Sequence, residues 1–354
     1  MRRSRPKRLE RAAKNLPVTD GTPTSTGSLP QRTLALYPGA SMAVLLALAA
    51  YALSTNYGAP VMLFALLLGM AVNFLGEDQR CALGIDFCSK TVLRTGVALL
   101  GLRVTGGHLM DLGWLPVALV VTAVVLTTAL GALLGRTLRL GGSFGVLTGG
   151  AVAICGASAA IAISSVLPDR GKADRALVFT IIGVTTLSTL AMVVYPAIVG
   201  LLNLTDLEAG VFLGGTIHDV AQVVGAGYSV SERAGDLATI VKLLRVAMLV
   251  PMVLAIMLIF SNSVAKPGDT AKFPLFLIAF VALAALSSAE IMPAFIIDFG
   301  NSLSRACLVV AIAAVGMQTQ LKEVAKMGWS PVVLMLAESA FIAVFVLTGY
   351  TLLR

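Results

Sequence analysis

Apolar stretches of about 20 residues, the length at which an α-helix crosses a bilayer, recur along almost the whole chain. They are continuous rather than alternating, so a transmembrane β-barrel is disfavoured. Charged residues make up 12% of the chain, whereas soluble domains carry about 25%. We therefore predict an all-α polytopic membrane protein with about 9–11 transmembrane segments.

Basic residues are concentrated at the N-terminus, and this accounts for much of the net charge of +8. The first 14 residues contain Arg2, Arg3, Arg5, Lys7, Arg8, Arg11 and Lys14. We predict that residues 1–35 form a disordered tail that keeps the N-terminus in the cytoplasm, rather than a separate site for anionic lipid. Residues 36–354 are predicted to form one transmembrane domain in the inner membrane of a bacterial cell.

Motifs for cofactor, metal or nucleotide chemistry are absent from the sequence. The four cysteines form no CxxC pair, and the two histidines, His108 and His218, lie far apart. There is no P-loop, dinucleotide fingerprint or nucleophile elbow. We expect no cofactor, no metal and no nucleic-acid partner, and an ATP-driven pump within this chain is disfavoured.

Two glycine-rich segments, 142–167 and 208–227, interrupt the apolar pattern. They contain VLTGGAVAICGASAA and VFLGGTIHDVAQVVGAG, and both bring polar groups to membrane depth. Such groups are costly in hydrocarbon and usually mark a solute or ion path. Glycine also breaks a helix, and the new helix N-terminus favours an anion. The alternative is that these small residues only allow close helix packing.

A duplication relates segment 89–120 to segment 304–335. At a constant offset, the two segments match at six pairs of positions: Ser89 and Ser304, Lys90 and Arg305, Gly101 and Gly316, Gly113 and Gly328, Trp114 and Trp329, and Pro116 and Pro331. Counting the intervening segments gives the two copies opposite directions across the membrane. We therefore predict inverted repeats, an architecture common among secondary transporters.

The loop PDRGKADR, which follows the first glycine-rich segment, carries three basic side chains. Basic loops prefer the cytoplasm, and this one stays there if the preceding segment does not cross completely. Both glycine-rich segments are therefore predicted to be discontinuous or re-entrant, with hairpins and broken crossing helices left as alternatives.

The predicted site lies between the two glycine-rich segments. Backbone amides near 156–158 and 214–216 are expected to bind an oxyanion. Lys242 and Arg245, which lie three residues apart on a later span, are expected to offset its charge. Those cations could instead pair with Asp219 or snorkel to an interface. The predicted substrate-binding residues are Gly149, Gly150, Cys155, Gly156, Ala157, Ser158, Gly214, Gly215, Thr216, Gln222, Lys242 and Arg245.

Proton coupling or gating is predicted for His218, Asp219 and Glu338, because intramembrane acids and histidines commonly serve this purpose. Glu338 could equally be the structural partner of a buried cation. Polar residues closer to span ends are interpreted as interface residues: Arg103, Asp298, Asn301 and Arg305.

The motifs GGAVAICGASAAIA, GGTIHDVAQVVGAG and TIVKLLRVAMLVP occur in the order expected of a known family. Over about residues 37–352 the chain resembles the YeiH-type (UPF0324) membrane proteins, which are labelled sulfate exporters. The resemblance implies a fold related to cation/proton antiporters and bile-acid-type symporters, with inverted repeats and discontinuous helices. It implies export of sulfate or a related sulfur oxyanion, in some members alongside organosulfonate breakdown. Homodimers are common in related folds.

The leading hypothesis is a secondary active transporter that exports a small oxyanion such as sulfate or sulfite, coupled to protons. One alternative is a cation/proton antiporter that uses Asp219. A remote alternative is a membrane-embedded enzyme or receptor. An enzyme is disfavoured because His218 and Asp219 are sequence neighbours, whose side chains diverge by about 100° on a regular helix.

Overall fold

The computed structural model describes residues 29–58, 60–103, 113–167, 170–259, 275–289, 292–319 and 329–353, with the backbone alone at 29–33, 170–175 and 353. Throughout these ranges every regular element is helical. Within the described ranges, six helices are long and apolar enough to cross a membrane: Leu34–Tyr57, Leu115–Thr137, Ala176–Leu201, Glu232–Ile259, Ala294–Met317 and Trp329–Leu352. Shorter apolar helices accompany them. The predicted all-α polytopic fold is confirmed, whereas most of the basic tail lies outside the described residues.

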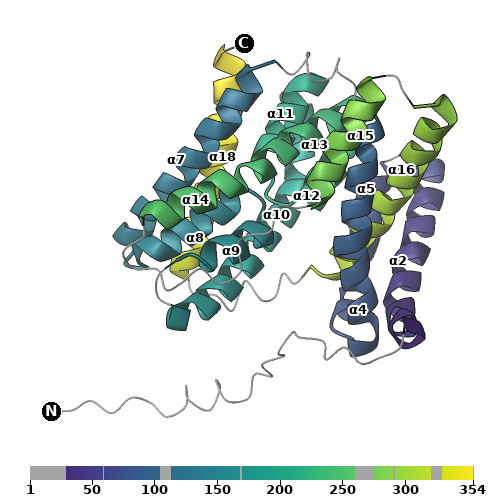
Figure 1. Ribbon diagram of the computed structural model, residues 1–354, viewed down its shortest axis with the longest axis horizontal. Coiled ribbons are helices and arrows are strands. Elements are labelled where there is room, and N and C mark those ends of the chain that lie inside the picture. The colour runs from purple at the N-terminus through teal and green to yellow at the C-terminus, as the bar shows by residue number, and fades with distance from the viewer. Residues whose placement is uncertain are drawn as a thin grey trace.

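The helices form two bundles (Figure 1). The first contains α2 (Leu29–Tyr57), α3 (Val61–Ala71), α4 (Gln79–Phe87), α5 (Leu93–Leu100), α15 (Leu275–Ser288) and α16 (Ala294–Met317). Short irregular turns, η1 (Asn73–Gly76), η2 (Cys88–Val92) and η3 (Gly101–Arg103), lie beside α4 and α5. Glycines allow α16 to approach α3 so closely that a β-carbon on Gly316 would lie 2.5 Å from the Leu66 carbonyl oxygen.

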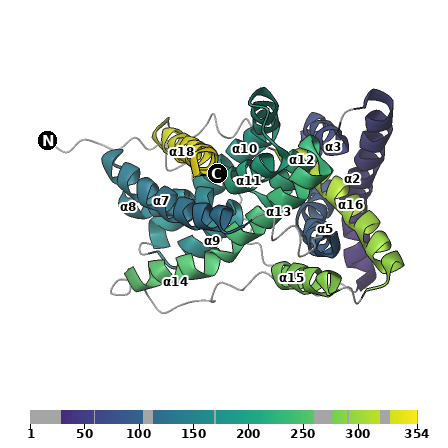
Figure 2. The same cartoon turned by 90° about the horizontal axis from the view of Figure 1, so that it is seen from above.

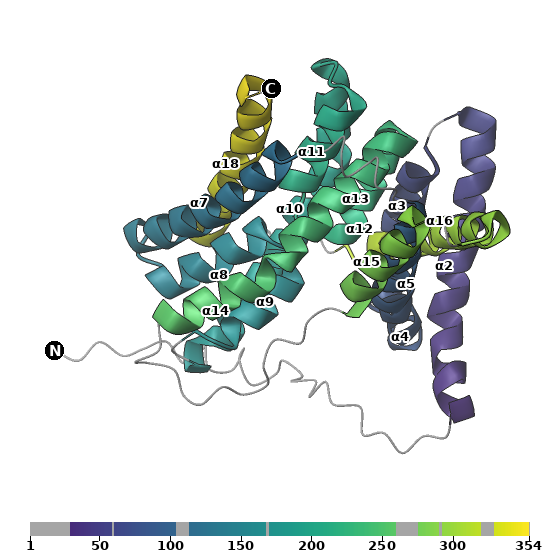
Figure 3. The same ribbon diagram turned by 45° about the horizontal axis from the view of Figure 1, so that its top comes forward.

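The second bundle carries both glycine-rich segments. It contains α7 (Leu115–Thr137), α8 (Gly142–Ala153), α9 (Ala157–Ser164), α10 (Arg170–Leu201), α11 (Asp206–Thr216), α12 (Val220–Val230), α13 (Glu232–Ala247), α14 (Leu249–Ile259) and α18 (Trp329–Leu353). Helix α12 also packs against α3 and α16, so it joins the two bundles (Figure 3).

Both glycine-rich segments are re-entrant hairpins. In the first, a β-carbon on Gly150 of α8 would lie 2.3 Å from Cδ1 of Ile163, so α9 runs back along α8. In the second, the Ser231 hydroxyl just after α12 donates to Oδ1 of Asp206, the first residue of α11, at 2.7 Å. The two ends of this segment therefore meet on one side. The sequence left hairpins and broken crossing helices as alternatives, and these contacts show that the segments are hairpins.

The hairpins enter from opposite sides. Helix α10 begins at the base of the α8–α9 hairpin and ends just before the base of the α11–α12 hairpin. Its segment Ala176–Leu201 is long enough to cross the membrane. Because one crossing helix separates their bases, the two hairpins reach the interior from opposite faces.

The repeat-related helices run antiparallel, as inverted repeats require. The first pair is α5 and α16. A β-carbon on Gly300 of α16 would lie 2.3 Å from Leu102, beyond the C-terminal end of α5. Further along α16, the Ser304 hydroxyl donates to the carbonyl of Gly96, within α5, at 2.6 Å, so the two helices run in opposite directions. The second pair, α7 and α18, is also antiparallel. Leu119 near the start of α7 packs against Gly349 near the end of α18. Residues 104–112 and 320–328, within the repeat-related segments, lie outside the described residues.

Glycines hold the first arm of each hairpin against its supporting helix. A β-carbon on Gly145 of α8 would lie 1.9 Å from the Gly131 carbonyl oxygen of α7. On α11, a β-carbon on Gly214 would lie 2.3 Å from the Ala238 carbonyl oxygen of α13. Such backbone contact is how small residues drive helix association in membranes.

Replacing Gly145 with alanine tests this packing, because the added methyl group would collide with backbone that cannot move aside. We expect Gly145→Ala to lower the free energy of unfolding by about 1–3 kcal/mol. The control is Gly200→Ala, since a β-carbon built there has no atom within 4 Å from the described residues beyond its own stretch of helix. The measurement is the thermal unfolding midpoint of the purified protein in detergent. Equal midpoints for the two variants would contradict the packing argument.

Candidate functional site

The tips of the two hairpins meet inside the second bundle. In Figure 2, α8 and α9 of the first hairpin lie towards the left, and α11 and α12 of the second lie nearer the centre. The first tip spans residues 154–156, and its Gly156 has a φ of 64°, a left-handed conformation that suits glycine. A β-carbon on Gly156 would lie 3.9 Å from the carbonyl oxygen of His218, in the second tip. The breaks in the two segments are therefore directly adjacent.

Helices α8 and α11 both end at these tips, which creates an electrostatic problem. The last carbonyls of a helix have no intrahelical partner, and the C-terminal end carries a partial negative charge. Water cannot satisfy such groups in the hydrocarbon region, where each costs several kcal/mol. Two negative helix ends therefore converge where solvent is scarce.

Two basic side chains of α13 resolve this problem. Lys242 Nζ donates to the carbonyls of Ile154 at 2.7 Å and Ile217 at 2.9 Å. Arg245 donates to four carbonyls of both hairpins, at the tips or in the last turns of α8 and α11: Ala153 at 2.8 Å, Val152 at 2.7 Å, Ile217 at 3.0 Å and Gly214 at 3.3 Å. We call this pair the cation clamp, because each side chain binds both tips.

The clamp differs in geometry from the sequence-based expectation. Lys242 and Arg245 are 0% and 1% exposed, so they do not snorkel to an interface. Their hydrogen-bond donors are directed at backbone carbonyls. Direct contact of either cation with a substrate stays a prediction, but their charge contributes a positive field at the tips.

His218 and Asp219 form the second tip and are held from several directions. The Ser188 hydroxyl of α10 accepts the backbone N–H groups of both residues, at 3.2 and 3.0 Å. His218 is buried; its Nδ1 lies 3.1 Å from the Val152 carbonyl oxygen and therefore donates to it, while Nε2 lies 2.9 Å from the Ser339 hydroxyl. His218 thus connects the two tips to α18.

The N-terminal ends of α9 and α12 are unequal. Asp219 caps α12, because its carboxylate accepts the Ala221 N–H at 2.9 Å. Helix α9 has no side-chain cap at its N-terminus. Ser158 in its first turn is exposed, and its hydroxyl has no hydrogen-bond partner within the described part of the chain. The first tip therefore presents an open positive helix end, and the second presents a carboxylate.

The remaining predicted residues are distributed around the tips. Gly149, Gly150, Gly214 and Gly215 are buried in helix contacts, and Cys155 is buried beside Gly156. Thr216 donates to the Phe212 carbonyl of its own helix at 2.6 Å. Gln222 donates to the Thr189 hydroxyl at 2.9 Å, and its buried Oε1 has no partner in the described chain. Substrate contact by these residues stays a prediction.

Glu338 lies on α18, against α7 and α8. The Thr148 hydroxyl lies 2.8 Å from its Oε1, whereas its buried Oε2 has no partner among the described residues. The neighbouring Ser339 contacts His218. Glu338 is therefore next in sequence to a residue that contacts the second tip, and its coupling role stays a prediction.

Several polar residues of the site were missed by sequence reasoning: Ser188, Thr189, Thr148 and Ser339. A signal for the first two existed, since TTLST at 185–189 places four hydroxyls in the middle of an apolar span. The described residues contain no group of three or more His, Cys, Asp or Glu side chains that could hold a metal ion.

Comparison with known proteins agrees with the motifs. Residues 36–335 match the family described as Conserved hypothetical protein 698. A UPF0324 membrane protein of Chlorobaculum tepidum is 52% identical over 315 residues, which cover 88% of each chain. The UPF0324 membrane protein TauZ of Paracoccus pantotrophus is 51% identical over 322 residues, covering 90% of this chain and 95% of TauZ. No solved structure matches. The match over most of the chain shows that this protein belongs to the UPF0324 family of membrane proteins.

Proposed function

We propose that this protein is a secondary active transporter that exports a small oxyanion, of the sulfate or sulfite class, across the bacterial inner membrane. The observation that carries the proposal is the meeting of two re-entrant hairpins from opposite faces, with an uncapped helix N-terminus at the tip of one of them. Discontinuous helices that meet near the midplane are the usual substrate site of secondary transporters.

The polarity of the tips favours an anion. The first N–H groups of α9 lack intrahelical partners and carry the positive end of its dipole. The exposed Ser158 hydroxyl adds a hydrogen-bond donor at the same place. The cation clamp already directs its donors at the negative ends of α8 and α11. A bound oxyanion would therefore rest mainly on backbone amides and Ser158.

Asp219 supplies a route to proton coupling. It is half-buried at the second tip, next to His218, whose carbonyl oxygen lies beside Gly156 at the N-terminus of α9. A carboxylate so close to an anion repels it, and a protonated carboxyl does not. Proton binding at Asp219 and anion binding at α9 should therefore favour one another to the same degree, because such coupling is reciprocal.

The anion position can be tested through its side-chain donor. We expect Ser158→Ala to raise the KM for sulfate about fivefold or more with little change in stability, because one hydrogen bond to a charged ligand is lost. Ser164→Ala is the control, since that hydroxyl donates to the Ile161 carbonyl at the other end of the same helix. The measurement is sulfate and sulfite counterflow in proteoliposomes. Flux by the folded wild-type protein no greater than in empty liposomes would refute transport of these anions.

Proton coupling can be tested with Asp219→Asn. Asparagine is an equally good helix cap, so α12 should keep its N-terminus while the charge disappears. We expect sulfate flux by this variant to be insensitive to an imposed pH gradient, whereas wild-type flux should respond to it. A variant that responds like the wild type would place the coupling group elsewhere. Cation-dependent proton flux that disappears in this variant, without any anion flux, would instead support the antiporter alternative.

The role of the clamp can be tested through stability. Arg245→Met removes donors from four carbonyls, so we expect the free energy of unfolding to fall by about 3 kcal/mol or more. Arg94→Met, at an exposed position on α5, is the control and should change it by about 0.5 kcal/mol or less. Thermal unfolding in detergent measures both. An Arg245→Met protein with wild-type stability and only a raised KM would show that Arg245 binds substrate.

A further inference from the structure

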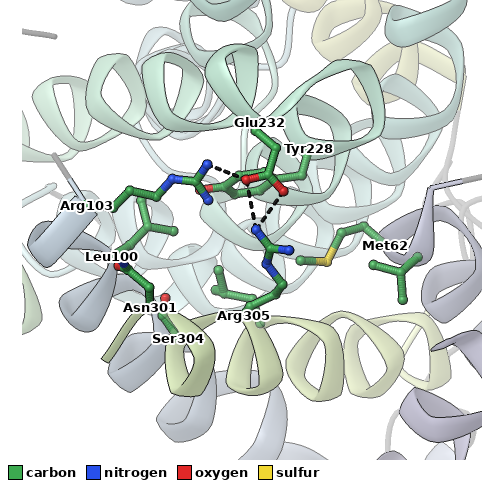
Figure 4. Close-up of a pocket in the computed structure, with 10 residues that line it drawn as sticks. Met62, Leu100, Arg103, Tyr228, Glu232, Asn301, Ser304 and Arg305 are labelled. Atoms are coloured by element: carbon green, nitrogen blue, oxygen red, sulfur yellow. Dashed lines mark hydrogen bonds and ion pairs between the residues drawn. The ribbon is translucent and has the colours of Figure 1, made fainter. Parts of the chain in front are cut away.

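A second polar cluster lies between the two bundles, away from the hairpin tips (Figure 4). Arg103 of η3 and Arg305 of α16 come from the first bundle, and Glu232 of α13 comes from the second. Figure 4 shows the Glu232 carboxylate between the two guanidinium groups. These ion pairs therefore connect helices that belong to different bundles.

The two acidic residues of the cluster are held in different ways. Glu232 accepts from Arg305 Nη2 at 2.6 and 2.8 Å and also from Arg103, yet its side chain is 54% exposed. Asp236 is only 4% exposed; it accepts from Arg103 Nε at 2.9 Å and from the Tyr228 hydroxyl at 2.6 Å. Asp236 is therefore a fixed partner of Arg103, whereas Glu232 can rotate towards solvent.

A cavity of about 70 Å³ adjoins the two arginines. One water molecule needs about 10–15 Å³ by the same measure, so the cavity has room for a small polyatomic ion. Asn301 lines the cavity one helical turn before Arg305. Its buried Oδ1 has no partner among the described residues. Because the two ends of an amide are assigned by their hydrogen bonds, Asn301 can equally direct its N–H₂ group towards this place.

We propose that Arg103 and Arg305 form a second binding site for a small oxyanion, which the Glu232 carboxylate occupies in this conformation. A carboxylate and a sulfur oxyanion present similar oxygen pairs to the planar guanidinium group. When Glu232 rotates away, two cations face one fixed carboxylate, that of Asp236, and the site gains a net positive charge. Asn301 then supplies a neutral hydrogen-bonding group to the same ligand.

The site and the second hairpin tip lie at different ends of α12. Helix α12 runs from the second tip to Tyr228 beside the cluster, about 12 Å along the helix axis. An anion that displaced Glu232 would break its two ion pairs with the first bundle and leave the Arg103–Asp236 pair in place. Binding here would thus loosen the contact that must open when one bundle moves against the other.

This inference deepens the proposed oxyanion transport, but it is tested by binding and needs no flux. The experiment is calorimetric titration of sodium sulfate into the purified full chain in detergent, with ionic strength held constant by sodium chloride. We expect Glu232→Gln to bind sulfate about tenfold more tightly than the wild type, because the competing carboxylate is gone. Adding Arg305→Gln to that variant should abolish the gain.

Two further variants separate binding from structural effects. Lys90→Gln, at the repeat position that corresponds to Arg305, removes an exposed cation paired with Asp86 and should leave the sulfate affinity unchanged. Arg305→Lys in the Glu232→Gln background keeps the charge without the planar fork and should retain only part of the gain. Each variant is first shown to be monodisperse and folded.

Unchanged or weaker sulfate binding by folded Glu232→Gln, or a gain that survives Arg305→Gln, would overturn this second site. Failure of the proposed function looks different. In that case Glu232→Gln would still gain affinity, while the wild-type protein would show no anion flux in liposomes.

Discussion

The structure depends on satisfying the backbone carbonyls of two helices that end inside the membrane. The C-terminal ends of α8 and α11 converge at the hairpin tips, where each unsatisfied carbonyl would cost several kcal/mol. Lys242 and Arg245 meet this requirement by donating to carbonyls of both tips. Removing water from these two cations is costly in turn, and their burial is tolerable only because the carbonyls and helix dipoles compensate it. The hairpins and the clamp are therefore mutually dependent.

This arrangement determines which chemistry is left at the tips. The negative ends of α8 and α11 are neutralised, so the N-terminal ends of α9 and α12 become the polar groups that can face a ligand. Asp219 occupies the end of α12, and the end of α9 remains open beside Ser158. This asymmetry supports anion binding at one tip and proton exchange at the other. Because the hairpins come from opposite faces, both proposed functions would lie where access can alternate between the two sides.

Much of the fold could be predicted from the sequence, because apolar length and glycine breaks are local signals. The breaks predicted within 142–167 and 208–227 are found between α8 and α9 and between α11 and α12, and the offset between Trp114 and Trp329 indicated the antiparallel helix pairs. The hairpin geometry could not be predicted, since it depends on tertiary contacts such as Gly150 with Ile163. The targets of Lys242 and Arg245 were also beyond the sequence, which shows charges at helical spacing but not the carbonyls of two distant segments.

The proposed transport depends on binding of the oxyanion at the open N-terminus of α9. The most direct measurement is an experimental structure of the protein with selenate, a sulfate analogue whose selenium can be located by anomalous scattering. We predict a selenium peak beside the first-turn amides of α9 and the Ser158 hydroxyl. A well-occupied peak in direct contact with Lys242 and Arg245, with their carbonyl hydrogen bonds broken, would contradict it.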